Sequence, residues 1–91
     1  PHIGHLYTAA LADAVTRYNQ MLGHDTFYST GTDEHGNKVR NAAELHNLSP
    51  INYCDKISSM FQQMCDNFDV KYSKFIRTTD EKHKDGVQKF W

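Results

Sequence analysis

Two histidines at the start of the chain have the residue types and spacing that could bind a phosphate group. His2 and His5 flank Ile3 and Gly4 and lead straight into an amphipathic helical pattern. A helix N-terminus offers unpaired backbone N–H groups and the positive end of the helix dipole, so it attracts anions. Gly4 has no Cβ, which would let a ligand approach the backbone closely. Two imidazoles on the same first turn would add side-chain donors, so this tetrapeptide predicts a phosphate site.

A second group of polar residues, Thr30–Gly36, follows a short run rich in aromatic and β-branched residues. That run, Thr26–Ser29, is typical of a strand, so we expect the polar motif in the loop at the strand's carboxyl end. Ligands bind at that edge in open α/β sheets. The carboxylate of Asp33 could bind a cation there, although an Asp in such a turn is often only a turn residue. Glu34 and His35 could orient the loop or contact a ligand, and the sequence does not separate these roles.

Metal binding is an alternative use of the histidines. His2, His5 and His35 could in principle be ligands, but the sequence contains no HExxH motif and no CxxC pair. No carboxylate completes a convincing ligand set, so we predict no metal site among these residues.

The periodicity of apolar residues predicts helices that alternate with strands. One helix is expected over residues 6–22, where Gly23 provides the stop, and a second over residues 38–46. Ser49–Pro50 is a good start for a third helix. Its apolar face would comprise Ile51, Cys54, Ile57, Phe61, Met64 and Phe68, and the first helix would bury Ile3, Leu6, Tyr7, Ala10, Leu11, Ala14, Tyr18, Met21 and Leu22.

The last part of the chain predicts a strand and then a helix. Residues 75–77 read as a strand, and Thr78 with Glu81 three residues later forms a capping-box pattern. The final helix would turn His83, Val87, Phe90 and Trp91 inward. The alternation of helices and strands favours an α/β domain with a parallel sheet. A strand before Pro1 is expected in order to complete the first strand–loop–helix unit.

Composition sets bounds on the class of protein. The 91 residues suffice for one small domain, and ten Lys and Arg against eleven Asp and Glu give no basic excess that would indicate nucleic-acid binding. No apolar run reaches the length of a membrane span.

Cys54 and Cys65 lie eleven residues apart in the expected third helix, roughly 16 Å, which is too far for a disulfide. The chain opens on Pro1 and ends on Phe90–Trp91, so we expect a piece of a longer protein.

Taken together, the motifs resemble the class I aminoacyl-tRNA synthetases. Residues 1–5 match the HIGH signature of that class, and residues 30–36 look like the second block of its methionine-specific branch. Residues 75–80 and 88–91 also resemble this branch, and the similarity covers the whole chain without gaps. The resemblance implies the first half of the catalytic domain: a partial Rossmann-like (HUP-type) nucleotide-binding domain with a parallel sheet, truncated at both ends.

The resemblance also implies an activity. Members of this branch use ATP, with Mg2+, to activate methionine to methionyl-adenylate and transfer it to tRNA(Met). By this resemblance, His2, Ile3, Gly4 and His5 would bind ATP, and the two histidines would act catalytically as negative charge shifts onto the leaving pyrophosphate. Asp33 would bind the methionine ammonium, with Gly31 and His35 as further substrate contacts. The tRNA would bind parts outside these 91 residues, and no membrane partner is expected.

Two features bear on location and on alternatives. Gln62–Gln63 and the FIRTTD run of residues 75–80 look more like mitochondrial members, which predicts the mitochondrial matrix, with the cytoplasm as the alternative.

A smaller HxGH nucleotidyltransferase of the same fold is a second hypothesis, which Thr30–Gly36 and a downstream lysine-rich KMSKS loop would exclude. A non-enzymatic RNA-binding or scaffolding module is a third, which methionine-dependent pyrophosphate exchange would exclude.

Overall fold

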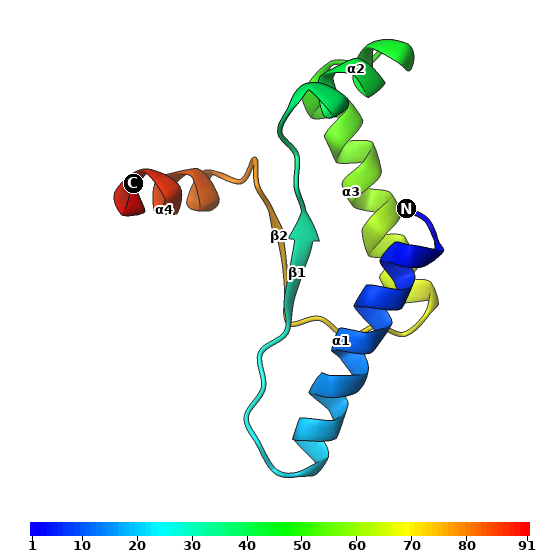
Figure 1. Ribbon diagram of the computed structural model, residues 1–91, viewed down its shortest axis with the longest axis vertical. Coiled ribbons are helices and arrows are strands. Elements are labelled where there is room, and N and C mark those ends of the chain that lie inside the picture. Colours follow the sequence, from blue (N-terminus) through cyan, green and yellow to red (C-terminus); the bar gives the residue numbers. More distant parts are fainter. The chain divides into compact units, whose positions relative to one another are not determined.

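The computed structural model describes residues 1–91 and contains four helices and two strands (Figure 1). In chain order they are α1 (Ile3–Met21), β1 (Ser29–Thr32), α2 (Asn37–Leu45), α3 (Pro50–Asn67), β2 (Lys74–Arg77) and α4 (Glu81–Phe90). The strands form a two-stranded sheet. Its hydrogen bonds pair Tyr28 with Ser73 and Thr32 with Thr78, in the same order along both strands, so the pairing is parallel. The predicted α/β alternation and parallel sheet are confirmed.

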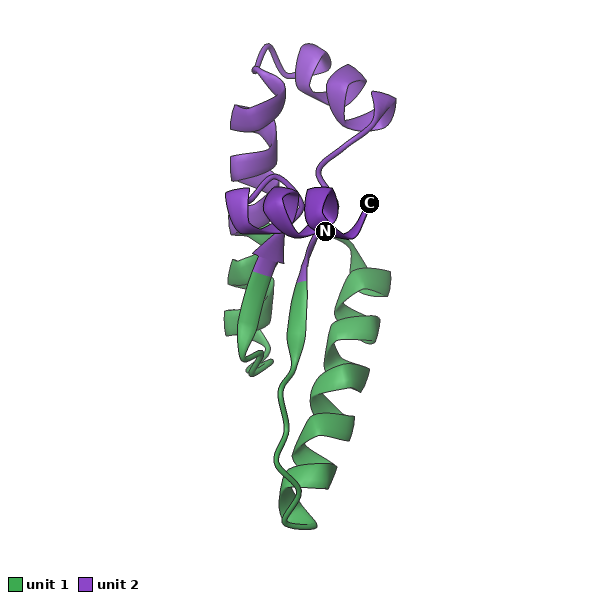
Figure 2. Ribbon diagram, turned by 90° about the vertical axis from the view of Figure 1, so that its left-hand side faces the viewer, with its two compact units in different colours: residues 1–30, 60–75 green, residues 31–59, 76–91 purple.

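The chain divides into two compact units, which Figure 2 shows in different colours. The first comprises residues 1–30 and 60–75, and the second comprises residues 31–59 and 76–91. Each unit therefore combines an early and a late part of the sequence. None of the helices has the length and apolar content needed to cross a bilayer.

The first unit packs around a small apolar cluster. Its buried members are Tyr28, Cys65 and Val70, and Ala9, Ala12, Met64 and Tyr72 pack against them. The phenol of Tyr28 donates a hydrogen bond to the Ala9 carbonyl at 3.1 Å, and its backbone N–H donates to the Ser73 hydroxyl at 3.0 Å. Tyr28 thus ties the segment before β1 both to α1 and to the segment before β2.

A buried aspartate attaches α1 to the turn that follows α3. Asp13 accepts hydrogen bonds from Arg17 Nε at 2.8 Å and from the Lys71 backbone N–H at 2.9 Å. Arg17 also donates to the Asp69 carbonyl at 2.6 Å. Asp69 has a φ of 57°, in the left-handed region, so these bonds hold a turn that is unfavourable for most residues.

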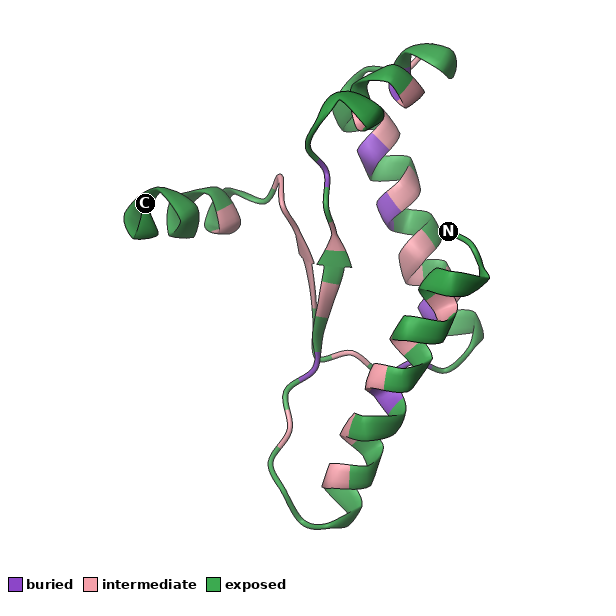
Figure 3. Cartoon of the chain, viewed as in Figure 1, coloured by how far each residue is buried: buried purple, intermediate pink, exposed green.

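The second unit buries small and polar residues. Ala43 of α2 and Cys54 and Ser58 of α3 are buried there, and Glu34 is the buried charged residue (Figure 3). Burial raises the pKa of the Cys54 thiol, and the nearby Glu34 carboxylate adds to the shift. Both cysteines are free and lie in α3, as the sequence predicts.

Three predicted boundaries hold within a residue or two, and one is wrong. The structure confirms α2, α3 and β2, and Ser49 accepts a bond from the Asn52 N–H at the start of α3. The first strand, however, runs over Ser29–Thr32 and not over Thr26–Ser29. The backbone bonds between the two segments run from the Tyr28 carbonyl to the Thr32 carbonyl, so the paired stretch lies later in the chain than predicted. Three of the seven residues of the predicted loop motif, Thr30–Thr32, therefore lie in the strand.

The predicted capping box at Thr78 is also wrong. The N-cap of α4 is Asp80, which makes no side-chain cap bond. The Thr78 hydroxyl is already engaged as the acceptor for the Glu34 N–H at 2.7 Å. The Asp80 carboxylate instead accepts from the Arg77 N–H at 2.9 Å. A tertiary contact has therefore taken the Thr78 hydroxyl, and a local bond to the Arg77 backbone has taken the Asp80 carboxylate.

The apolar faces predicted for α1 and α4 are largely exposed. The α1 stripe is exposed at Ile3, Tyr7, Ala10, Leu11, Ala14, Tyr18, Met21 and Leu22, with Leu6 half-buried, and α4 exposes Val87, Phe90 and Trp91, with His83 half-buried. Ile51 of α3 and Phe68, which directly follows α3, are also exposed. The side of α1 that packs within its unit is instead that of Ala9, Ala12 and Asp13. Small side chains face the cluster, because they allow α1 to approach the Tyr28 ring closely.

Candidate active site

The two N-terminal histidines form a reciprocal cap on α1. His2 is the N-cap, and its Nδ1 accepts a hydrogen bond from the Gly4 N–H at 3.0 Å. His5 Nδ1 accepts from the His2 N–H at 3.1 Å, which completes a capping box built from two imidazoles. A ring nitrogen that accepts a hydrogen bond carries no proton. Each neutral ring is therefore fixed in the tautomer that carries its proton on Nε2.

The rings of this pair are held against each other and against α3. Their centroids lie 3.9 Å apart in a stacked arrangement, and the centroids of the His5 and Phe61 rings lie 4.9 Å apart in an edge-on arrangement. Burial, and then repulsion from His2, lower the pKa of His5 below 6.5. A depressed pKa favours the neutral ring, so this contribution to stability is complete above pH 6.5 and is lost as the pH falls through the lowered pKa. Because Nδ1 of each ring accepts a bond in the cap, each ring has its Nε2–H left as a donor beside a helix N-terminus.

Gly4 is needed by the cap itself. A Cβ at this position would lie 2.8 Å from His2 Cε1 and 3.0 Å from His2 Nδ1, closer than such atoms normally approach. A larger residue would therefore push the His2 ring out of its capping position. The close approach of a ligand to Gly4 stays a prediction, and the structure adds this second reason for a glycine.

Asp33 and Glu34 are neighbours in the chain with opposite surroundings. Asp33 is exposed and takes part in none of the chain's ion pairs. Glu34 is buried, and Arg77 Nε donates to both of its carboxylate oxygens at 2.9 Å. The free carboxylate at Asp33 is the one available to a ligand. Binding of the substrate by Asp33 stays a prediction, and the buried Glu34 has different partners.

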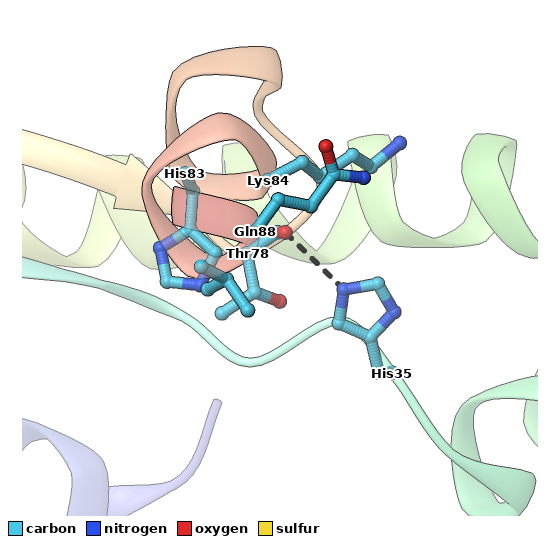
Figure 4. Close-up of a pocket in the computed structure, with 6 residues that line it drawn as sticks. His35, Thr78, His83, Lys84 and Gln88 are labelled. Carbon is cyan, nitrogen blue, oxygen red and sulfur yellow. Dashed lines mark hydrogen bonds between the residues drawn. The ribbon is translucent and has the colours of Figure 1, made fainter. Parts of the chain in front are cut away.

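His35 extends from the same loop into a hollow at α4. Its Nε2–H donates to the Thr78 carbonyl at 3.2 Å, which leaves Nδ1 as a free acceptor in the neutral ring (Figure 4). The hollow has a volume of about 260 Å³ and is lined by His35, Thr78, His83, Lys84, Val87 and Gln88. The structure therefore groups His35 with donors of α4, a set of neighbours that the sequence does not indicate.

Gly31 lies within β1 and faces the backbone of β2. A Cβ at this position would run into the carbonyl oxygen of Ile76. Close strand packing explains why a glycine stands here. A direct contact of Gly31 with substrate stays a prediction.

The candidate residues fall into one group in each unit. His2, Ile3, Gly4 and His5 lie together at the start of α1 in the first unit, and Gly31, Asp33 and His35 lie in the second. Sequence reasoning missed two supports, Phe61 beside His5 and Arg77 beside Glu34. Arginine at the end of a short strand was the one available signal, since a charge in such a position usually has a buried partner. No group of three or more His, Cys, Asp or Glu side chains is placed to hold a metal ion.

Comparisons with known proteins agree on one family. The family model described as tRNA synthetases class I (M) matches residues 1–91. A probable mitochondrial methionine–tRNA ligase of Dictyostelium discoideum is 54% identical over 91 residues, which are 100% of this chain and 16% of that protein. The human mitochondrial methionine–tRNA ligase is 47% identical over 94 residues, again 100% of this chain and 16% of the relative. A Helicobacter pylori methionine–tRNA ligase is 48% identical over 88 residues, which are 97% of this chain and 14% of its own length.

A solved structure gives the same result for the fold. The Mycobacterium tuberculosis methionyl-tRNA synthetase bound by methionyl-adenylate matches with a TM-score of 0.97 and 35% identity, over 100% of this chain and 18% of that one. The predicted Rossmann-like fold is thereby confirmed. The chain spans about 16% of the length of the first curated relatives that it matches.

Proposed function

The chain belongs to the class I tRNA synthetases (M), and we propose that it forms the first half of the catalytic domain of a methionine–tRNA ligase. The observation that carries the proposal is the match of all 91 residues to a synthetase structure bound by methionyl-adenylate. The proposed substrates are methionine, ATP and tRNA(Met), and the tRNA would contact parts of the protein outside these residues. The family match favours this activity over the smaller nucleotidyltransferase and over a non-enzymatic module.

The chemistry joins two anions, so charge must be neutralised. In adenylation the methionine carboxylate attacks the α-phosphorus of ATP and expels pyrophosphate, and the protein must hold both reactants in line. In the proposed reaction, Nε2–H of His2 and of His5 donates to phosphate oxygens as negative charge builds on the leaving group. The reciprocal cap supports this role, because it fixes both tautomers with Nε2–H outward.

Asp33 supplies the other half of the proposal. Methionine enters with a charged ammonium and an apolar thioether, so only the ammonium offers a positive charge to a fixed anion. The exposed, unpaired carboxylate of Asp33 would bind it and orient the substrate carboxylate. A charge-assisted hydrogen bond of this kind contributes roughly 1.5–3 kcal/mol. His35 would lie beside it on the same loop.

Mg2+ is expected from the family, but these residues do not provide a site for it. No cluster of three metal-ligating side chains is present in the chain, and the reaction steps above involve only its own donors and acceptors. A magnesium ion would have to be bound by the triphosphate and by residues elsewhere in the protein.

The test of the proposal is methionine-dependent ATP–pyrophosphate exchange by the full-length protein. Asp33→Asn keeps the size of the side chain but removes its charge, so we expect the KM for methionine to rise at least about tenfold, the equivalent of ~1.4 kcal/mol. The KM for ATP should change little. An analogue of methionine without the amino group serves as the control, and its weak binding should be indifferent to the substitution. If Asp33→Asn weakens binding of the analogue as much as binding of methionine, Asp33 does not bind the ammonium.

For location we propose the mitochondrial matrix. Mitochondrial ligases from three organisms, D. discoideum, Xenopus laevis and human, support this, although bacterial ligases are similar as well. Fluorescence of the tagged full-length protein should coincide with a matrix marker. A purely cytoplasmic signal would contradict the proposal.

A further inference from the structure

Glu34 is a buried carboxylate at the centre of a hydrogen-bond network in the second unit. Its side chain is only 2% exposed. Both carboxylate oxygens accept from Arg77 Nε at 2.9 Å, and the hydroxyls of Thr32 and Thr79 also donate to them. Three residues, one each from β1, β2 and the segment after β2, therefore converge on one side chain.

The backbone of Glu34 is held as well. Its N–H donates to the Thr78 hydroxyl at 2.7 Å, and its carbonyl accepts from the Cys54 thiol. Arg77 extends the network to α3, where its Nη2 lies 2.7 Å from Asp55 Oδ1. Burial alone would lower the pKa of Arg77, but the hydrogen bonds to Glu34 and the ion pair with Asp55 outweigh it and raise that pKa. The bond to Thr78 thus holds the peptide unit that joins Asp33 to Glu34, and the bond from Cys54 holds the peptide unit that follows it.

Burying a charged network of this kind at a turn is unfavourable in free energy. Burying a carboxylate and a guanidinium costs several kcal/mol per ion unless both are paired and hydrogen-bonded. A solvated turn would avoid that cost. The network instead makes the loop rigid at Glu34. The residue that benefits is Asp33, which precedes Glu34 and keeps a free carboxylate.

We propose that Glu34 is a positioning residue that fixes the loop backbone so that Asp33 presents its carboxylate to the ammonium of the substrate. The inference rests on the proposed function, because it assigns Glu34 a role in that same site. Preorganised groups bind a charge without having to reorganise at the moment of binding, which is why a supporting network matters. Glu34 itself touches no substrate in this proposal.

The experiment measures the substrate KM values of full-length Glu34→Gln in methionine-dependent pyrophosphate exchange. Glutamine keeps the shape but replaces one acceptor oxygen with an NH2 donor, which would face the donors of Arg77 and Thr79. We expect the KM for methionine to rise about tenfold while the KM for ATP stays within about twofold. Glu44→Gln, at an exposed carboxylate of α2, is the matched control and should change neither value.

A double-mutant cycle with Asp33→Asn separates positioning from general stabilisation. If Glu34 acts through Asp33, then Glu34→Gln should raise the methionine KM less than about twofold further in the Asp33→Asn background. An equal rise in both backgrounds would overturn the proposal. So would an equal loss of binding by the analogue that lacks the amino group.

Thr79→Val provides a second test of the role of Glu34, which applies even if the Glu34→Gln protein does not fold. This variant removes one donor to Glu34 and preserves side-chain shape. We expect a rise of about twofold to threefold in the methionine KM, again lost in the Asp33→Asn background. No change in a folded Thr79→Val protein would count against Glu34. Wild-type protein without methionine-dependent exchange would instead refute the proposed function, a result distinct from any of the variant outcomes.

Discussion

Asp33 and Glu34, and likewise His2 and His5, take their roles from surroundings rather than from residue type. The two carboxylates are adjacent, yet one is exposed and the other is enclosed by Arg77 and two threonines. The two imidazoles share one task because each uses Nδ1 in the cap of α1. Side-chain identity predicted which residues could do chemistry. The hydrogen-bond partners decide which atom of each is available.

At His5 the cap and the phosphate donor can be separated by two substitutions. Asparagine places an acceptor near the position of Nδ1, so His5→Asn should keep the bond from the His2 N–H while it removes the Nε2 donor. Glutamine places its amide near Nε2 and loses the cap acceptor. We expect His5→Asn to lower the single-turnover rate of adenylation by on the order of 10²–10³, and His5→Gln to retain more activity. Methionine binding should change little in either variant.

The reverse order of activities would contradict the assignment. If His5→Gln were the slower enzyme and His5→Asn were normal, the histidine would matter for the helix cap and not for phosphate. Far-ultraviolet circular dichroism of both full-length variants checks that any loss of rate is not unfolding.

At the scale of elements, the sequence predicted those whose signals are local. The start of α3 follows from Ser49–Pro50, and the end of α1 from Gly23, which has a φ of 85°. The wrong predictions are those in which a distant residue intervenes. β1 is shifted because its ladder depends on β2, and Thr78 does not cap α4 because Glu34 occupies its hydroxyl.

Histidine caps could not be foreseen from propensity. Ser, Thr, Asp and Asn are the residues that favour the N-cap, so the predicted helix begins at residue 6 and not at Ile3. Only the geometry reveals that the imidazoles replace those side chains. The candidate site was therefore predicted as a set of residues, whereas the atoms that it presents required the structure.

Gly31 and Gly86 provide a matched pair for the sheet. A Cβ at Gly31 would collide with the Ile76 carbonyl, whereas a Cβ at Gly86 in α4 meets nothing within 4 Å. Gly31→Ala should lower the free energy of unfolding by about 1–3 kcal/mol, because the strands must separate. Gly86→Ala should raise it by roughly 0.5–1 kcal/mol through helix propensity. Urea unfolding of the full-length protein measures both, and a neutral Gly31→Ala would mean that β1 and β2 do not pack as described.

At the scale of the whole chain, burial is sparse. The apolar cluster of the first unit has three buried members, Tyr28, Cys65 and Val70. By contrast, fifteen large hydrophobic side chains are exposed, among them Ile3 at 84%, Phe90 at 90% and Trp91 at 99%. Small domains bury the smallest fraction of their surface and are correspondingly marginal. The amphipathic pattern in the sequence correctly identified helices, but it did not identify which apolar side these 91 residues bury.

These 91 residues expressed alone would expose the apolar faces of α1 and α4. Large exposed apolar patches promote association, so we expect the isolated chain to self-associate, to bind a hydrophobic dye and to show no methionine-dependent pyrophosphate exchange. Light scattering, dye fluorescence and the exchange assay measure these properties. Leu11→Glu with Tyr18→Glu should reduce association, because both side chains are more than half exposed at 54% and 61%. Val70→Glu, at a residue 5% exposed, should abolish what folded structure remains. A monomeric, dye-silent wild-type chain would contradict the burial pattern, and measurable exchange would contradict the need for the rest of the catalytic domain.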